Sequence, residues 1–333
     1  MSNNIILYGG GLFEFNWGSM NDAQLDMIQN SGFTTVVLWA MHVDAQGNFI
    51  YNNSTSPLVQ NGQFVGTSGN PDFVNQLNQL KTGGTVKQYF ISIGGWGCQD
   101  FTNMQNLIQT EQGQATLIQN FKALAENLPI SGIDFDMEES YDTDMLNTIV
   151  WLTGNLSQLG LQVTYCPYQQ QNFWFNCLAQ SYTKCGNRQP VSWLNLQCYA
   201  GGASNTPTLW ALEMRAYGLS KMGITNPNAF IMPGYWCRNA VDNNGGPYNP
   251  SCPYDDCPST IQNTFAQLSK TDPGICGGFI WNSSDIFTTL ISNPQSCTGG
   301  TITPADYAQA IINGLAGKTS ELSDKQRAEA SRG

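Results

Sequence analysis

The feature that most constrains the fold is an alternation of short β-rich runs with stretches of helical periodicity. Eight such runs recur along the chain, at residues 5–9, 34–41, 86–94, 132–137, 163–167, 194–199, 230–236 and 277–281. Helical patterns lie between or after them, at residues 23–30, 72–81, 115–127, 145–159, 209–222, 261–270 and 304–315. This alternation favours a parallel sheet, and eight strand–helix units close into a barrel. We therefore expect an α/β protein with a single-domain (β/α)8 fold, a TIM barrel.

The length and composition fit one such domain. The chain has 333 residues, of which 41% are hydrophobic, and this is enough for a barrel with a sizeable core. We assign residues 1–317 to the barrel. Residues 318–333 are rich in charged side chains, with Leu322 as their one large apolar residue, and we expect a disordered polar tail there.

The charge balance excludes several classes of partner. The chain carries 24 Asp and Glu against 13 Lys and Arg, a formal net charge of -11. Such a balance opposes binding to phosphate backbones and anionic membranes, so we expect neither nucleic acid nor a membrane as partner. No run approaches the ~20 apolar residues of a membrane span. We expect a monomer that binds a neutral substrate.

The scarcity of histidine narrows the chemistry. His42 is the only histidine, which argues against a Ser–His–Asp hydrolase and against a His-based metal centre. No Cys–His spacing of the zinc-site kind occurs. We expect no metal and no other cofactor, and for His42 a hydrogen-bonded place in a loop or in the core.

Nine of the ten cysteines fall into two groups. Cys177 and Cys185 bracket a polar segment, as do Cys252 and Cys257. Both pairs, with Cys237 as a further candidate, could form disulfides in an oxidising compartment. The others lie in or beside apolar runs and are expected to be buried thiols, namely Cys98, Cys166, Cys198 and Cys276.

Three acids share one face of the fourth β-rich run. Side chains alternate across a strand, so Asp134, Asp136 and Glu138 point into the barrel, while the apolar residues between them pack under the helices. Like charges this close cannot all ionise, so at least one pKa must rise. A carboxylic acid that stays protonated near neutral pH suits the proton donor of a glycosidase, and Glu138 is outermost. The alternative, a charged edge strand, needs an antiparallel sheet, which the alternation disfavours.

This segment resembles the signature of glycoside hydrolase family 18, Asp-x-x-Asp-x-Asp-x-Glu on the fourth barrel strand. Asp134, Asp136 and Glu138 match its last three positions, and Ser131 stands where the first Asp would be. That position is farthest from the chemistry, so the resemblance still implies an active enzyme. It leaves open how the deep hydrogen-bond network around Asp134 closes.

Further motifs support the resemblance, in the same order along the chain. The sequence from Ser92 to Trp96 resembles the Ser-x-Gly-Gly of the third strand, and Ser92 could hydrogen-bond Asp134. Gln197-Cys198-Tyr199 resembles the Gln-x-Tyr of plant-type and bacterial members at the end of strand six. Active sites of TIM barrels lie at the carboxyl ends of the strands. Conspicuous side chains stand there at Tyr8, Trp39, Trp96, Glu138, Tyr168, Tyr199, Trp236 and Trp281.

The resemblance implies hydrolysis of chitin or N-acetylglucosamine oligosaccharides with retention, by a substrate-assisted route. Glu138 would be the acid, Asp136 would bind the acetamido N–H, Asp134 would share a proton with Asp136, and Tyr199 would hold the acetamido oxygen. Trp281 would form the floor of the sugar site. The other substrate-binding candidates are Gln197, Tyr8, Trp96 and Ser92.

Three functions remain open at this stage. The first is an endo-acting chitinase, because the segment from Tyr235 to Ser259 is too short for the inserted domain that deepens the cleft of some members. The second is an endo-β-N-acetylglucosaminidase that acts on N-glycans. The third is a non-catalytic carbohydrate-binding relative, which the three retained acids disfavour. The resemblance also implies a secreted, extracellular protein, although no signal peptide is visible at the N-terminus.

Overall fold

A closed barrel of eight parallel strands forms the centre of the molecule in the computed structural model, which describes residues 3–9, 22–52, 54–69, 71–237, 257–292 and 302–320. The barrel strands are β1 (Asn4–Tyr8), β2 (Thr35–Val43), β6 (Gln88–Gly94), β7 (Gly132–Asp136), β8 (Gln162–Tyr165), β9 (Val191–Gln197), β10 (Ile231–Trp236) and β11 (Gly277–Trp281). Each pairs in parallel with the next, and β1 pairs with both β11 and β2, which closes the ring. The predicted (β/α)8 barrel is confirmed, and so are its eight strands.

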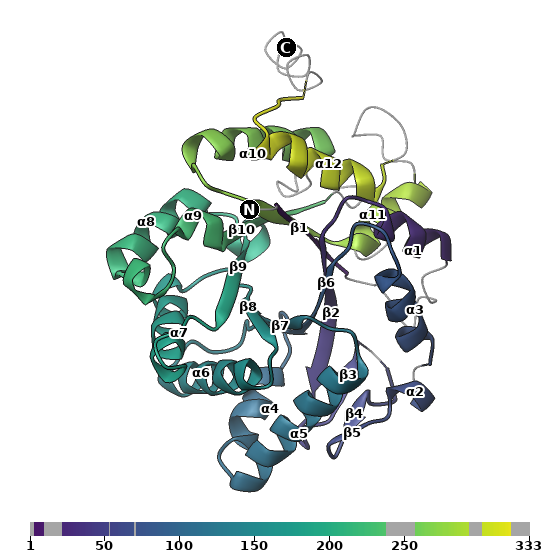
Figure 1. The fold of residues 1–333 in the computed structure, drawn as a ribbon, viewed down its shortest axis with the longest axis vertical. Coiled ribbons are helices and arrows are strands. Elements are labelled where there is room, and N and C mark those ends of the chain that lie inside the picture. Colours follow the sequence, from purple (N-terminus) through teal and green to yellow (C-terminus); the bar gives the residue numbers. More distant parts are fainter. Residues whose placement is uncertain are drawn as a thin grey trace.

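Helices surround the barrel (Figure 1). They are α1 (Asp22–Gln29), α2 (Gly66–Gly69), α3 (Pro71–Lys81), α4 (Asp100–Leu107), α5 (Glu111–Asn127), α6 (Thr143–Gln158), α7 (Gln171–Lys184), α8 (Pro207–Tyr217), α9 (Pro227–Phe230), α10 (Pro258–Thr271), α11 (Ser283–Ser292) and α12 (Pro304–Leu315), with short 3₁₀ helices η1 (Ala200–Gly202) and η2 (Leu219–Met222). The predicted helix over 209–222 is two helices, because Gly218 adopts a left-handed conformation with φ of 91° and ends α8.

A small antiparallel extension follows β2. Strands β3 (Phe49–Tyr51), β4 (Val59–Gln60) and β5 (Gln63–Phe64) continue the sheet outward from the carboxyl half of β2, where Met41 pairs with Tyr51. This extension was not predicted from the sequence, and β2 runs to Val43 where the predicted strand ended at residue 41. The longer β2 carries His42 beyond the barrel proper.

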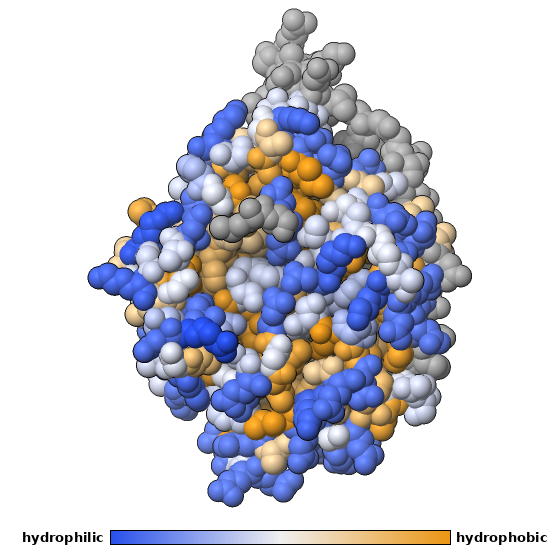
Figure 2. All heavy atoms as spheres, in the orientation of Figure 1, coloured by the Kyte–Doolittle hydropathy of each residue, from blue (hydrophilic) through white to orange (hydrophobic). Residues whose placement is uncertain are grey.

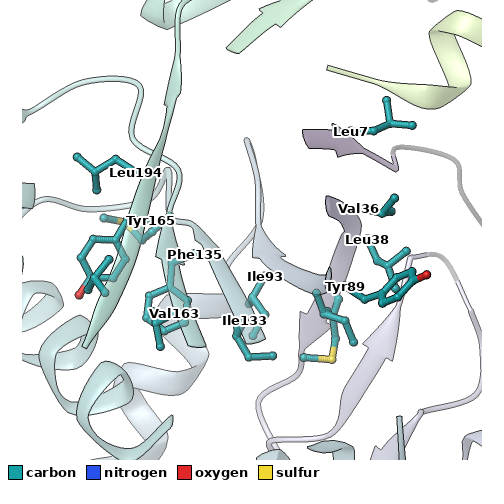
Figure 3. Packing of buried hydrophobic residues seen from close by; sticks show 14 of the residues in the cluster. Leu7, Val36, Leu38, Tyr89, Ile93, Ile133, Phe135, Val163, Tyr165 and Leu194 are labelled. Carbon is teal, nitrogen blue, oxygen red and sulfur yellow. The ribbon is translucent and has the colours of Figure 1, made fainter. Parts of the chain in front are cut away.

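The strands bury two separate apolar layers, as their alternation requires. One set of strand side chains faces the helices, and Figure 3 shows members of this layer such as Ile133, Phe135 and Val163. The other set fills the barrel interior, and it includes Ile6, Val37, Phe90, Trp193 and Phe279. Two positions apart on β7, Asp134 and Asp136 belong to this interior face. The predicted division of that strand into an outer apolar face and an inner acidic face is therefore confirmed.

The face of the molecule in Figure 2 carries both hydrophilic and apolar residues. In the view of Figure 2, hydrophilic residues cover much of the outline with apolar residues between them, as is usual for folded domains. Among the described helices, none is long and apolar enough to cross a membrane. Most of the predicted tail over 318–333 falls outside the described residues, although the backbone N–H of Ser320 donates to Asn263 Oδ1 at 2.9 Å.

The cysteines depart from one prediction. Cys177 and Cys185 are both free thiols, because the segment between them is not a loop but the last part of α7. Eight positions along a helix separate Cα atoms by ~12 Å, whereas a disulfide needs them within ~7 Å. Cys237 is a buried thiol whose Sγ contacts the carbonyl oxygen of Asn282 at 3.2 Å. Cys257 is disulfide-bonded, and Cys252 lies outside the described residues.

Candidate active site

The three acids of β7 stand at increasing height in the barrel. Asp134 is completely buried, Asp136 is 4% exposed, and Glu138, just past the end of the strand, is partly exposed. Their order follows from the strand period, because every second residue rises on the same face toward the carboxyl end. Only Glu138 combines contact with the buried acids and access from outside.

Asp134 is held by a complete set of hydrogen-bond donors. Its Oδ2 accepts from the hydroxyls of Tyr8 at 2.9 Å and Ser92 at 2.8 Å. Its Oδ1 accepts from the hydroxyl of Thr164 at 2.6 Å and from Asn195 Nδ2 at 3.0 Å. Burial raises the pKa of Asp134, and these four hydrogen bonds oppose the rise.

This network closes without an acid at position 131. Ser131 lies before β7, where its Oγ accepts from the backbone N–H of Tyr89 at 3.2 Å. The donors to Asp134 come instead from four other strands, namely β1, β6, β8 and β9. The departure of Ser131 from the family signature therefore leaves no gap around Asp134.

Asp136 contacts a different set of groups from those of Asp134. Its Oδ2 accepts from Trp39 Nε1 at 3.0 Å, and its Oδ1 accepts from Gln197 Nε2 at 3.0 Å. Burial raises the pKa of Asp136 well above its ordinary value, and the negative charges of Glu138 and then Asp134 raise it further. Asp136 also hydrogen-bonds Glu138, an interaction that raises the pKa of Asp136 and lowers that of Glu138.

Asp136 and Glu138 are therefore coupled, because each changes the pKa of the other. The sharing of a proton between Asp134 and Asp136 stays a prediction, and Asp134 raises the pKa of Asp136 through its negative charge. Two strongly coupled carboxyls titrate as a unit. Glu138 is the partly exposed member of the pair.

Glu138 has the raised pKa that a proton donor needs. Burial raises its pKa, while hydrogen bonds accepted from Gln197 and from Asp136 moderate the rise. Gln197 Nε2 donates to Glu138 Oε1 at 3.1 Å as well as to Asp136, so that this one amide bridges the two acids. The next residue, Glu139, points elsewhere and accepts from the backbone N–H groups of Phe101 and Thr102 at the start of α4.

Aromatic rings surround the acids at the carboxyl end of the barrel. Trp281, at the end of β11, lies edge-on to Trp39 with ring centroids 5.1 Å apart. It is stacked against Tyr199 at 6.3 Å and an interplanar angle of 21°. Trp281 and Trp39 are only partly buried, so both offer ring surface to a ligand. Rings of this kind stack against the apolar faces of sugars.

Tyr199 belongs to this aromatic group and is almost buried. Burial raises its pKa well above the ordinary value, and charges on Cys166, Asp136 and Glu138 contribute. Its hydroxyl is therefore a neutral hydrogen-bond donor at every physiological pH. The ring of Trp236 lies 5.9 Å from that of Tyr199, and Trp236 Nε1 donates to Asp285 Oδ2 at 2.6 Å.

Two glycines after β6 allow this crowding. Gly94 has a φ of 105°, and a Cβ there would lie 2.3 Å from the carbonyl oxygen of Asp136. Gly95 has a φ of 109°, and its Cβ would lie 2.7 Å from the ring of Trp39. Both positions require glycine for conformation and for space. The turn that they form presents Trp96 with 86% of its side chain exposed.

The predicted site residues thus separate into three groups. Asp136, Glu138 and Gln197 are directly hydrogen-bonded, with Tyr199 and Trp281 packed beside them. Tyr8 and Ser92 were expected to bind substrate, but both are completely buried, and their hydroxyls bond Asp134. Trp96 stands alone on an exposed turn.

Three residues of the network were missed by sequence reasoning. Trp39 holds Asp136, while Thr164 and Asn195 hold Asp134. A signal for the last two was present, because each is a polar residue at an inward position of an otherwise apolar strand. Trp39 was noted only as a conspicuous side chain at a strand end.

Another hollow lies away from this site. A cavity of about 570 Å³ opens between α6 and α7, with Trp151, Gln180 and Lys184 among its lining residues. It contains none of the acids and lies on the outer side of the barrel. We therefore place the candidate active site at the carboxyl end of the strands.

Solved structures with the same fold are glycoside hydrolases of family 18. A fungal endo-β-N-acetylglucosaminidase of this family is 17% identical, with a TM-score of 0.59 over 94% of this chain and 98% of that one. Catalytic domain 2 of the Group II chitinase from Ostrinia furnacalis is 10% identical, with a TM-score of 0.61 over 96% and 97% of the two chains. The Group IV chitinase from the same organism, in complex with allosamidin, is 13% identical, with a TM-score of 0.59 over 96% and 100%.

The sequence itself gives no such match. Comparison with protein-family models and with curated protein sequences finds none. At identities this low, the structural likeness establishes the family 18 chitinase-like fold, and the argument for activity comes from the acids themselves.

Proposed function

We propose that this chain is an endo-acting chitinase that hydrolyses β-1,4 linkages between N-acetylglucosamine units with retention of configuration. The observation that carries the proposal is the pair of Asp136 and Glu138 at the carboxyl end of β7, which one amide, that of Gln197, bridges at 3.0 and 3.1 Å. The likeness of the fold to family 18 chitinases supports the same function. The acidic net charge of -11 agrees with a neutral substrate.

In this proposal Glu138 protonates the glycosidic oxygen as the bond to the anomeric carbon breaks. Burial raises the pKa of Glu138, which favours the protonated form before the reaction, and its partial exposure lets the substrate reach it. Gln197 keeps the carboxyl in place through its bond to Oε1. After the leaving group departs, the ionised Glu138 acts as a base on the incoming water.

The nucleophile is the acetamido oxygen of the substrate itself, which attacks the anomeric carbon and forms a cyclic oxazolinium ion. Asp136 binds the acetamido N–H and stabilises the positive charge that develops. As Glu138 gives up its proton, Asp136 can rotate toward the substrate, because its ties to Trp39 and Gln197 are single hydrogen bonds. Asp134, with four donors of its own, is held in a fixed position below Asp136.

The aromatic group forms the sugar site of this mechanism. Trp281 provides the floor under the reacting sugar, and the neutral hydroxyl of Tyr199 holds the acetamido oxygen in position for attack. Trp96, on its exposed turn, is placed for stacking against a more distant sugar of a chain. Tyr8 and Ser92 take no direct part, because both are buried beneath Asp134.

An internal mode of attack suits the short connection after β10. The segment from Cys237 to Cys257 joins β10 to α10, and it is too short for an inserted domain that would roof the cleft. Extracellular use is part of the same proposal, and the disulfide at Cys257 is consistent with an oxidising compartment.

The test is mass spectrometry of products from chitin oligosaccharides. The wild-type protein should release N-acetylglucosamine oligomers by internal cleavage, and Glu138→Gln should release none while it still binds them. Glu139→Gln is the matched control, because the neighbouring carboxyl is tied to the start of α4 and should be dispensable for turnover. Wild-type turnover by Glu138→Gln would refute the assignment of the acid.

A second candidate follows from one comparison. The fungal structure of the same fold is an endo-β-N-acetylglucosaminidase, whose reaction could use the same acids. Incubation with a glycoprotein that carries N-glycans separates the two functions. Release of glycans together with inactivity on chitin oligosaccharides would favour the second candidate.

A further inference from the structure

A second cluster of chemically reactive side chains lies outside the acid network. His42 Nδ1 contacts Asp100 Oδ2 at 2.9 Å, and the imidazole also hydrogen-bonds the thiol of Cys98. One ligand-type atom from each of the three residues lies within 4.8 Å of the other two. The mechanism proposed above uses none of them.

The fold brings the cluster together from three separate segments. His42 lies on the part of β2 that extends past the barrel, Cys98 lies in the turn after β6, and Asp100 begins α4. Strands β2 and β6 are parallel neighbours, with Met41 opposite Ile93, so their carboxyl ends meet at the same edge. Cys98 and Asp100 therefore lie beside His42, the single histidine of the chain.

Neighbouring groups orient the side chain of Asp100 and leave the three ligand atoms directed at one another. Asp100 is 4% exposed, and its Oδ1 accepts from the backbone N–H of Val43 at 2.8 Å. That bond orients the carboxylate and leaves Oδ2 directed at His42. Cys98 is a free thiol that is partly exposed, and 32% of the His42 side chain is exposed, so solvent can reach the cluster.

We propose that His42, Cys98 and Asp100 form a binding site for a zinc ion, with water as the fourth ligand. Imidazole, thiolate and carboxylate are the three donor types that Zn²⁺ takes from proteins, and three protein ligands plus water is a common set. Two ligands at ~2 Å from a tetrahedral ion lie ~3.3 Å apart. The His42–Asp100 pair, at 2.9 Å, needs to open by only a few tenths of an ångström.

The chemistry of the donors selects the metal. A thiolate and an imidazole favour zinc over Mg²⁺ or Ca²⁺, which prefer oxygen ligands. On binding, the metal replaces the proton of the imidazole and that of the thiol, and both protons pass to solvent.

The ordinary alternative is a charged hydrogen bond that ties β2 to α4 and binds nothing. It explains the contact of His42 with Asp100, but it gives no role to the thiol as third member. A bound ion would link β2, the turn that carries Trp96 and the first turn of α4. The metal would therefore stabilise the conformation of these three segments and would not take part in the chemistry of Asp136 and Glu138.

The experiment is metal binding by the full chain after treatment with a chelator. Titration with Zn²⁺ by calorimetry should show one site, and Co²⁺ should give an absorption band of thiolate-to-metal charge transfer. Cys98→Ser should abolish that band and, like His42→Gln, weaken Zn²⁺ binding by ~10-fold or more. Asp100→Asn should weaken it similarly while the bond from Val43 to Oδ1 keeps the fold.

Cys185→Ser is the matched control, because Cys185 is another partly exposed free thiol, and it lies at the end of α7. It should leave the Co²⁺ band and the Zn²⁺ affinity unchanged. No saturable Zn²⁺ binding by the wild-type protein, or binding that all three ligand variants retain, would overturn the proposal. Both readouts are independent of hydrolysis, so failure here leaves the proposed function standing.

Discussion

Replacing Gln197 by Leu tests how the two acids are tuned. The side-chain amide of Gln197 donates to Asp136 at 3.0 Å and to Glu138 at 3.1 Å, and leucine fills a similar volume without a donor. A hydrogen bond to a charged group contributes ~1.5–3 kcal/mol, and ~1.4 kcal/mol corresponds to one pKa unit. Because the amide is shared, we expect the pKa of Glu138 to rise by about one unit.

The assay is the pH dependence of kcat/KM on a chitin oligosaccharide. Glu138 must be protonated to act as the acid, so its pKa sets the falling limb of the profile at high pH. Loss of the donor from Gln197 destabilises the ionised form, and the falling limb of Gln197→Leu should move to higher pH by about one unit. The maximal rate should fall as well, because the two acids lose their common support.

Gln189→Leu provides the control. Gln189 precedes β9, and its side chain bonds the backbone at Leu178, Met222 and Val191 rather than an acid. It should leave the profile in place. A falling limb of Gln197→Leu that stays where it is in the wild type, or that moves to lower pH, would refute the account of Glu138 as an acid tuned by this amide.

Three further expectations follow from the same contacts. Asp134→Ala removes the acceptor of four hydrogen bonds, those from the hydroxyls of Tyr8, Ser92 and Thr164 and from the amide of Asn195. The free energy of unfolding, measured by denaturant titration, should therefore drop by ~3 kcal/mol or more, and a drop below ~1 kcal/mol would contradict the network. The pKa of Glu138 is higher in the folded chain than the ~4.3 of the unfolded chain, so ionisation of Glu138 lowers the free energy of unfolding as the pH rises above ~4.3. The Tm of Glu138→Gln should therefore exceed that of the wild type by an amount that grows from pH 4 to pH 8, and a difference that is largest at pH 4 would contradict this. The chemical step should need no metal, so EDTA should leave kcat unchanged, and rescue of a lost kcat by a divalent ion would overturn this.

Periodicity made the barrel and its acids predictable. The period of two along β7 gave the inward face of Asp134 and Asp136 and the outermost place of Glu138, since this rule depends on local backbone geometry alone. The eight strands followed from the same kind of pattern. The helix α7 was missed because its apolar positions alternate with many polar ones, and its two cysteines looked like the ends of a loop.

The bond from Ser92 to Asp134 was predicted and is confirmed, but most partners of the acids were not predicted, because they depend on register between strands. Ser92 and Thr164 stand opposite Asp134 on the two neighbouring strands, a pairing set by the whole barrel. Trp39 reaches Asp136 from β2, and His42 meets Cys98 and Asp100 from the same strand. Spacing along the sequence suggested no metal ligands, since these three residues converge only in the folded chain.

The stereochemistry of the first product tests the central claim most directly. In the proposed mechanism the acetamido group attacks from the side opposite the leaving group, and water then displaces it from the side that the leaving group occupied, so two inversions give net retention. Proton NMR of a fresh reaction on chitin oligosaccharides should therefore show the β anomer first, with α appearing only by later mutarotation. Cello-oligosaccharides, which have a hydroxyl in place of the acetamido group, should not be cleaved. An initial α product, or comparable rates on cello-oligosaccharides, would contradict the mechanism even if Glu138 proved essential.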